Sequence, residues 1–189
     1  MPDHPTESSV LAANAAALRR SSLGALEEQV VALFDELRAP LLRYLSAFPL
    51  AAQESEDVIQ EAFLALFQHL RAGKSHSNVR GWLFRAAHNI ALKNSMRAKK
   101  REQFAAPGEF DNSIADPSPS AEDQLERSRR QKRLMSVVRA LPEQSRWCLY
   151  LRAEGLRYRE IAEVLNISAA SVAVYLERSL ALMARAVER

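Results

Sequence analysis

The sequence predicts an all-α protein with two small helical domains that a flexible acidic linker joins, the C-terminal domain containing a helix-turn-helix. Three observations predict this fold. The chain has five glycines in 189 residues and is rich in Ala, Leu, Glu and Arg, residues that favour helices. Apolar residues recur at helical spacing in several segments. A stretch without Lys or Arg, residues 102–126, separates two basic helical regions.

The composition excludes several classes of protein. With 48% hydrophobic and 26% charged residues, the chain can bury one sizeable core or two small ones. A single cysteine, Cys148, excludes a disulfide framework and, with only four histidines, a Cys-rich zinc site. We find no signal peptide and no apolar run near the roughly 20 residues that span a bilayer, so we expect a cytoplasmic protein without membrane insertion. No phosphate-binding loop, nucleophile elbow or carboxylate pair is present, so we expect no enzymatic activity, no metal and no cofactor.

The first helical region, residues 27–101, follows an N-terminal extension, residues 1–26, that we expect to be a loose tail or a weak extra helix. The first helix of the region begins near Val30 and contains Pro40, which should kink or split it. The second helix has the strongest periodicity in the sequence, because its apolar residues form a nearly unbroken stripe along one face. That stripe consists of Ile59, Ala62, Phe63, Leu66, Phe67 and Leu70.

The third helix of this region, from Val79 to about Arg101, has two different faces. On the core side we expect Val79, Leu83, Ala87 and Ile90. The other face carries two large apolar side chains, an amide and several cations: Trp82, Arg85, Asn89, Lys93, Met96, Arg97 and Lys100. A basic helix end is favourable because of the helix dipole alone. A stripe of this composition is also what DNA phosphates and unstacked bases require.

The second helical region, residues 127–189, contains a predicted helix-turn-helix at residues 155–180. Asn166 stands where a helix ends in a left-handed residue, and Ser168 can cap the next helix through its hydroxyl. The core side of that next helix is expected to consist of Val172, Leu176, Leu180 and Met183. Its outward side would enter a major groove, so DNA is the first partner that we expect.

Four motifs in a fixed order give the chain a resemblance to a known family. The motifs are EDVIQEAFLALF, NVRGWLFRAAHNIALKNSMRAKKR, the acidic linker and LPEQSRWCLYLRAEGLRYREIAEVLNIS. Over about residues 27–189 the chain resembles bacterial RNA polymerase sigma factors of the extracytoplasmic-function (ECF) subfamily. The resemblance implies a subunit that binds core RNA polymerase, directs it to specific promoters and helps to open the −10 region.

The same resemblance implies roles for residues of the first region. The helix matching Asp57 to Leu70 would dock on the largest polymerase subunit, with contacts from Asp57, Gln60, Glu61 and Leu64. The loop at residues 71–78 and the helix after it would hold the −10 element and flip a base out of the stack into a pocket. The residues that the resemblance implies in −10 binding are His76, Ser77, Asn78, Trp82, Arg85, Asn89, Lys93, Arg97 and Lys100.

The second region resembles the module that reads the −35 element, but its recognition helix is poor in cations. Between Ser168 and Leu182 the only cation is Arg178, whereas readout of guanine favours Arg or Lys. We therefore expect weak or unusual −35 recognition. The residues that the resemblance implies there are Arg157, Arg159, Ser168, Ser171, Tyr175 and Arg178.

The sequence leaves several alternatives. The apolar surface of Ala173, Val174 and Tyr175 could meet an inhibitory anti-sigma factor, a partner that we expect beside polymerase and promoter DNA. A degenerate sigma factor would act mainly through such protein contacts. A free-standing helix-turn-helix regulator, normally a dimer on palindromic half-sites, would not bind polymerase. The acidic linker could thread through polymerase or serve as a plain tether.

Overall fold

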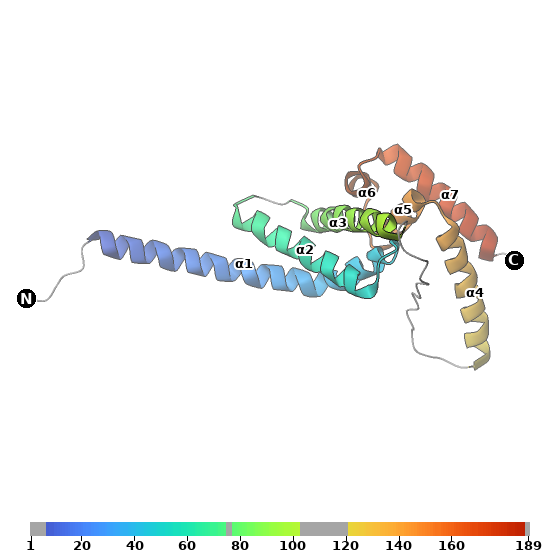
Figure 1. Cartoon of the computed structure of the whole chain (residues 1–189), viewed down its shortest axis with the longest axis horizontal. Coiled ribbons are helices and arrows are strands. Elements are labelled where there is room, and N and C mark those ends of the chain that lie inside the picture. The colour runs from blue at the N-terminus through green and yellow to red at the C-terminus, as the bar shows by residue number, and fades with distance from the viewer. Residues whose placement is uncertain (1–6, 75–76, 103–120, 188–189) are drawn as a thin grey trace, which may run out of the picture.

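The structure is a computed structural model that describes residues 7–74, 77–102 and 121–187. Within these ranges it is all-α, as predicted, and contains no strand. Its helices are α1 (Glu7–Leu45), α2 (Ala52–Arg71), α3 (Val79–Glu102), α4 (Ala121–Ala140), α5 (Glu143–Ala153), α6 (Tyr158–Leu165) and α7 (Ala169–Val187) (Figure 1). Helices α1 to α3 pack together, and helices α4 to α7 pack together.

The first group of helices is built on the apolar stripe of α2. Ile59, Ala62, Phe63 and Leu66 are buried, as the periodicity predicted, while Phe67 and Leu70 are partly buried. Phe63 meets Phe34 of α1 edge to face, with ring centroids 5.0 Å apart. Helix α2 therefore lies between α1 and α3 with its apolar face covered and its opposite face free.

Helix α1 is longer and more continuous than the sequence predicted. It begins at Glu7, so it crosses the expected boundary at residues 26 and 27, and it runs through Pro40 without being split. The segment LAANAAALRR at residues 11–20 consists mostly of strong helix formers, which explains the early start. Proline removes only one backbone donor, and neighbouring Leu37 and Leu41 are buried against the core.

The predicted faces of α3 need one correction. Leu83 and Ala87 are buried as expected, but Phe84 and His88 are buried too. Trp82, predicted on the outward face, is only partly exposed and lies against the His69 ring, with centroids 5.3 Å apart. The core face is wider than predicted because α3 packs on helices of both groups, on α1 and α2 and also on α6.

The second group begins earlier than predicted, because α4 starts at Ala121, inside the segment assigned to the linker. In α7, Val172 and Leu176 are buried as expected, but Leu180 is 56% exposed and Ser179 is fully buried in its place. The Ser179 hydroxyl donates a hydrogen bond to the Tyr175 carbonyl oxygen, 2.7 Å away, so a polar residue is satisfied in the core.

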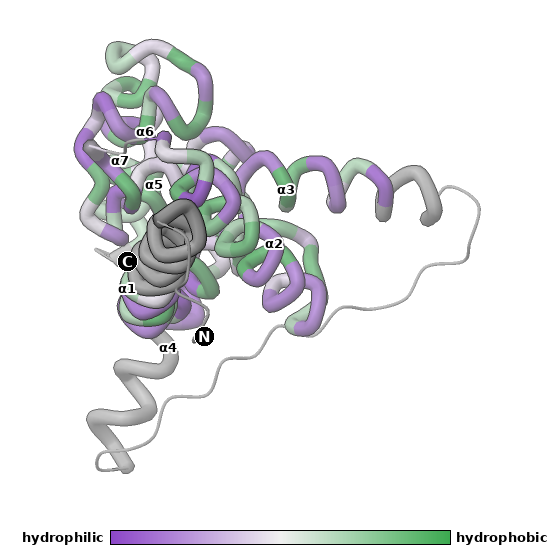
Figure 2. The backbone as a smooth tube through the Cα atoms, turned by 90° about the vertical axis from the view of Figure 1, so that its left-hand side faces the viewer, coloured by the Kyte–Doolittle hydropathy of each residue, from purple (hydrophilic) through white to green (hydrophobic). Residues whose placement is uncertain are grey.

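No single described helix is long and apolar enough to cross a bilayer. Helices α6 and α7 reach the required length and hydropathy only when taken together, and they are bent by 104° at the turn between them. Figure 2 shows hydrophobic and hydrophilic residues interleaved along the coloured parts of the helices, as amphipathic packing requires.

Candidate nucleic-acid interface

The outward face of α2 carries the four residues that the sequence assigned to polymerase contacts. Asp57, Gln60, Glu61 and Leu64 are all exposed, and they recur at i, i+3, i+4 and i+7 on the side opposite the buried stripe. Leu64, near the middle of this face, is 58% exposed. One face of α2 is therefore free for a partner and has an apolar residue at its centre.

The loop before α3 ends in Asn78, which caps this helix. The Asn78 carboxamide oxygen accepts a hydrogen bond from the Gly81 backbone N–H at 2.8 Å, which caps α3. A Cβ at Gly81 would lie 2.7 Å from the Asn78 side-chain nitrogen, so a side chain at this position would force the capping amide to shift. Ser77 is exposed, whereas His76 lies outside the described residues.

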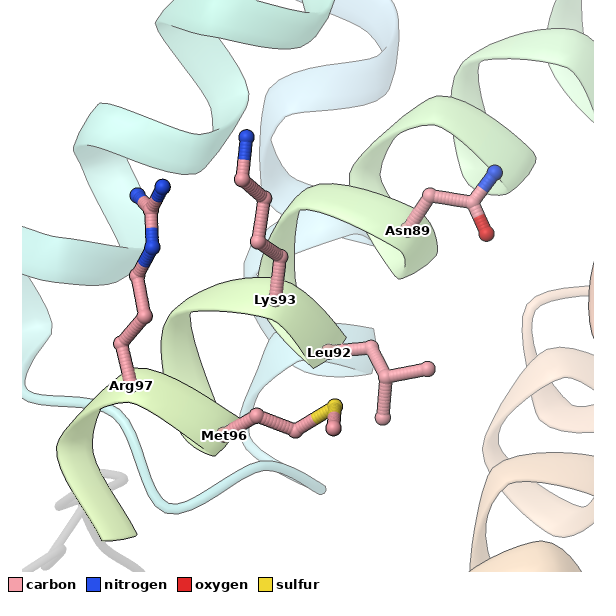
Figure 3. A pocket seen from close by; sticks show the side chains of 5 residues that line it. All are labelled: Asn89, Leu92, Lys93, Met96 and Arg97. Atoms are coloured by element: carbon pink, nitrogen blue, oxygen red, sulfur yellow. The ribbon is translucent and has the colours of Figure 1, made fainter. Parts of the chain in front are cut away.

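The solvent side of α3 carries the predicted −10 residues. Asn89, Leu92, Lys93, Met96 and Arg97 line a shallow hollow along the helix (Figure 3). In Figure 3 the Lys93 and Arg97 side chains, one turn apart, extend in the same direction, while Leu92 and Met96 extend in another. Arg85 is exposed as well, and Lys100 is a position whose side chain is not described. Two cations beside an apolar floor suit a backbone phosphate and the face of a base.

The helix-turn-helix has the predicted local geometry. Asn166 ends α6 in the left-handed conformation, with φ 52° and ψ 47°. The Ser168 hydroxyl accepts a hydrogen bond from the Ser171 backbone N–H at 2.9 Å and so caps α7. The two helices meet at 104°, within the range of about 90–120° that helix-turn-helix motifs show.

The residues predicted for −35 binding differ in their exposure to solvent and in their hydrogen bonds. Arg157, Arg159 and Arg178 are exposed. Ser171 is only partly exposed, and the Tyr175 hydroxyl donates a hydrogen bond to the Gln144 side-chain oxygen at 2.6 Å. The Tyr175 hydroxyl is therefore bonded to α5 in this structure, and a base contact through it would have to replace this hydrogen bond.

The two groups of helices meet through contacts that the sequence did not predict. The Glu154 carboxylate, at the end of α5, accepts hydrogen bonds from Arg43 Nε at 2.7 Å and Arg43 Nη2 at 2.8 Å. The Glu154 carbonyl oxygen accepts another from Arg80 of α3 at 2.5 Å. Asn78 donates through its side-chain nitrogen to the Glu160 carboxylate of α6 at 2.7 Å. No local pattern could have paired Arg43 with Glu154, because they lie 111 residues apart.

Aromatic rings form the apolar centre of this contact. Trp147 of α5 stacks on Phe48, with centroids 5.3 Å apart and planes 20° apart. The rings of His88 and Trp147 are nearly perpendicular, with centroids 4.9 Å apart, and the Tyr44 hydroxyl lies 2.7 Å from His88 Nδ1. Burial lowers the pKa of His88 to about 4 and raises the pKa of the neighbouring Cys148 thiol to about 11. His88 is thus neutral and Cys148 protonated near neutral pH, which leaves the thiol unreactive as a nucleophile.

The buried neutral state of His88 should make stability depend on pH. An unfolded histidine binds a proton below about pH 6.5, whereas the native His88 does so only near pH 4. Between these values the unfolded state binds more protons, so stability falls as pH falls. We expect the free energy of unfolding at pH 5 to be about 2 kcal/mol lower than at pH 8 through this one group.

Urea unfolding across pH 5–8 would test this expectation. His88→Gln should flatten the dependence on pH, whereas the control His69→Gln should retain it. If the free energy of unfolding depends equally on pH in wild type and in His88→Gln, His88 is not the cause of the pH dependence, whatever the absolute stability of the variant.

Comparisons with known proteins bear on both groups of helices. The family model described as Sigma-70 region 2 matches residues 33–102, and the one described as Sigma-70, region 4 matches residues 131–183. These matches place α2 and α3 in one sigma region and the helix-turn-helix in the other. The ECF RNA polymerase sigma factor SigM of Bacillus subtilis is 26% identical over 133 residues, 68% of this chain and 77% of that protein. The chain belongs to the RNA polymerase sigma factors of the ECF type.

Named relatives support the same assignment. The RNA polymerase sigma-H factor of Pseudomonas aeruginosa is 34% identical over 130 residues, 64% of this chain and 66% of that protein. RNA polymerase sigma factor YlaC of Bacillus subtilis is 26% identical over 148 residues, 78% of this chain and 85% of that protein. The probable RNA polymerase sigma factor RfaY of Xanthomonas campestris pv. campestris is 32% identical over 129 residues, 66% of this chain, but the match spans 32% of that protein.

The fold of the sigma factor also has a solved counterpart. The structure of CnrH in complex with the cytosolic domain of CnrY matches 91% of this chain and 96% of that chain, with a TM-score of 0.57 and 20% sequence identity. Sigma factors are initiation factors and not enzymes. Among the described residues no group of three or more His, Cys, Asp or Glu side chains could hold a metal ion.

Proposed function

We propose that this sigma factor binds core RNA polymerase through the exposed face of α2, brings the enzyme to specific promoters and helps to open their −10 region. The observation that supports the proposal is that three separate surfaces lie on three different parts of the chain. A free face with Leu64 at its centre lies on α2, a hollow flanked by Lys93 and Arg97 lies on α3, and a capped helix-turn-helix follows. A free-standing DNA-binding regulator would have no need for the first of these surfaces.

The side chains of α3 support the opening step. Asn89, Leu92 and Met96 offer an amide and apolar contacts to an unstacked base, and Lys93 and Arg97 offer charge to the backbone of a single strand. Flipping a base costs a few kcal/mol, which contacts with the correct base offset. Recognition and strand opening would then occur in the same step.

The helix-turn-helix is proposed to contribute to −35 recognition mainly through phosphates. Arg157, Arg159 and Arg178 are exposed, whereas the N-terminal half of α7 presents small or apolar residues. Direct readout of guanine by Arg or Lys at that half is not available. We therefore propose a weak contribution of the −35 element to promoter choice.

The partners and the location follow from the same proposal. Core polymerase and promoter DNA are the primary partners, and the protein works in the cytoplasm where polymerase works. We also propose an anti-sigma factor, which the apolar Val174, Leu180 and Leu182 side chains on α7, all more than 40% exposed, would suit. The structural neighbour CnrH is itself solved in complex with a second protein, the cytosolic domain of CnrY.

Transcription in vitro from fragmented genomic DNA would test the proposal. Core polymerase is assayed with and without this protein, and the RNA 5′ ends are mapped. We expect new start sites that share upstream sequence at −10 and, more weakly, at −35. Binding of the protein to DNA fragments without new transcripts and without binding to core polymerase would favour the free-standing regulator.

A further inference from the structure

The outward side of α7 carries small apolar residues in its first two turns, where the second helix of a helix-turn-helix contacts the edges of bases. Counted from the buried Val172 at about 100° per residue, Ala170 and Val174 lie about 160° and 200° round the helix, opposite the core. Ala170 is exposed, Val174 is 42% exposed, and Ala173 beside them is partly exposed. We use the term alanine–valine surface for Ala170, Ala173 and Val174.

The polar side chains of the same two turns already have partners inside the protein. The hydroxyl groups of Ser168 and Ser171 share a hydrogen bond, with their oxygens 2.8 Å apart, and the Ser168 oxygen also caps the helix. The Tyr175 hydroxyl donates to the Gln144 side-chain oxygen at 2.6 Å. No Lys or Arg precedes Arg178 in α7. The alanine–valine surface is therefore the part of this half of α7 that is free to meet a base pair.

Thymine is the base that apolar side chains recognise in a major groove. Its C5-methyl group lies at the edge of the groove, whereas the other three bases present donors and acceptors there without a methyl group. Burying one methyl group raises affinity about 4-fold, whereas a bidentate contact from arginine to guanine contributes up to about 100-fold. Readout of thymine by methyl contacts would therefore agree with the weak contribution of the −35 element proposed above.

Exposed cations on both helices of the motif suit the phosphates of the same duplex. Arg157 and Arg159 lie at the start of α6, the helix that crosses the DNA backbone in motifs of this type. Arg178 follows Val174 by about one turn on α7 and is exposed as well. Glu177, next to Arg178, has no donor and cannot replace the missing contact to guanine. An apolar surface with cations before and after it along the chain fits a DNA groove, because the cations complement the phosphates.

We propose that the alanine–valine surface selects thymine in the −35 element through contacts with its C5-methyl group, and that Val174 is the residue that determines this specificity. The proposal rests on the function proposed above and names the base that the helix-turn-helix reads. Promoters of this sigma factor then share thymines near −35 and need no guanine there. Removing the thymine methyl groups weakens promoter binding although every base pair is kept.

Deoxyuridine gives a direct test, because it differs from thymidine only in lacking the C5-methyl group. The probe is the promoter with the strongest transcript among the mapped start sites, synthesised with thymidine or with deoxyuridine in the −35 element and unchanged elsewhere. Its affinity for the full-length protein assembled with core polymerase is measured by competition between the two duplexes. We expect the deoxyuridine duplex to bind about 4-fold more weakly for each methyl group that the surface contacts.

Val174→Ser separates contact with methyl groups from recognition of the shape of A·T-rich DNA. Serine and valine have similar helix propensities, and Val174 lies outside the core, so the variant should fold normally. We expect this variant to bind the thymidine and deoxyuridine duplexes within about 2-fold of each other. Val31→Ser makes the same change at a 60% exposed position of α1 and should keep the wild-type preference for thymidine.

Three results would overturn the inference. The first is a set of mapped start sites whose shared −35 element lacks thymine. The second is an equal preference for thymidine in wild type and in Val174→Ser, which would mean that DNA shape is read and not the methyl group. The third is equal binding of both duplexes by wild type, which would leave the alanine–valine surface to a protein partner. Absence of any new start site would overturn the proposed function and this inference with it, whereas the three results above leave the proposed function standing.

Discussion

Replacing Leu64 with aspartate is expected to abolish polymerase-dependent transcription while the protein stays folded. Leu64 is 58% exposed and lies between Gln60 and Glu61 on one side and the end of α2 on the other. Aspartate at the centre of a docking face would bury an unpaired charge against polymerase, and loss of a central interface contact of this kind costs about 2 kcal/mol or more. We therefore expect the affinity for core polymerase to fall at least about 30-fold. The measurement is a titration of labelled protein with core enzyme.

Val31→Asp provides the control for this variant. Val31 is 60% exposed on α1, so the change has the same chemistry at nearly the same exposure but away from the proposed face. It should leave core binding within about 2-fold of wild type. If Leu64→Asp binds core polymerase as well as Val31→Asp does, polymerase does not use this face of α2. Melting curves of both variants would show that neither result comes from unfolding.

The parts of the structure that the sequence predicted correctly depend on neighbours along the chain. The stripe from Ile59 to Leu70 shows a 3.6-residue period, and the buried and exposed faces of α2 follow from it. The turn of the helix-turn-helix needs only Asn166 in the left-handed conformation and a capping hydroxyl at Ser168. In both cases the physical cause lies within about one or two helical turns, so a single sequence contains it.

The error in α7 shows where hydrophobicity misleads. Counted from Val172 at about 100° per residue, Ser179 lies about 20° from the same line and Leu180 about 80° away. The angular position on the helix thus predicts that Ser179 is buried, whereas hydrophobicity alone predicts that Leu180 is buried. The serine is tolerated because its hydroxyl bonds to the Tyr175 carbonyl oxygen in its own helix.

The contact between the two groups of helices could not be predicted from local patterns. Arg43 and Glu154 are 111 residues apart, and the segment between α3 and α4 gives no indication of how the groups meet. His88 illustrates the consequence. From the sequence it stands next to the predicted DNA stripe, but in the structure it is buried against Trp147 and Tyr44. Only the tertiary arrangement decides whether such a residue belongs to a surface or to a core.

Reversing two charges on α3 should stop promoter opening without preventing assembly with polymerase. Lys93 and Arg97 are exposed one turn apart beside the hollow that Asn89, Leu92 and Met96 line (Figure 3). Each would neutralise a phosphate of the single strand, and hydrogen bonds to charged groups contribute about 1.5–3 kcal/mol. Losing two contacts predicts a fall in open-complex formation of about 100-fold or more. Permanganate reactivity of thymines near a mapped start site would measure the opening.

The double variant Lys132→Glu with Arg133→Glu on α4 changes the net charge by the same amount at exposed positions. It controls for the general attraction between a basic protein and DNA, which salt screens. We expect Lys93→Glu with Arg97→Glu to bind core polymerase normally, to lose permanganate reactivity and to show a shallower dependence of DNA binding on salt. Because Leu64→Asp should fail at assembly and this variant after assembly, the two results together would locate docking on α2 and opening on α3. Equal loss of opening in both charge variants would instead mean that the charge of the whole protein matters and that the α3 surface has no special role.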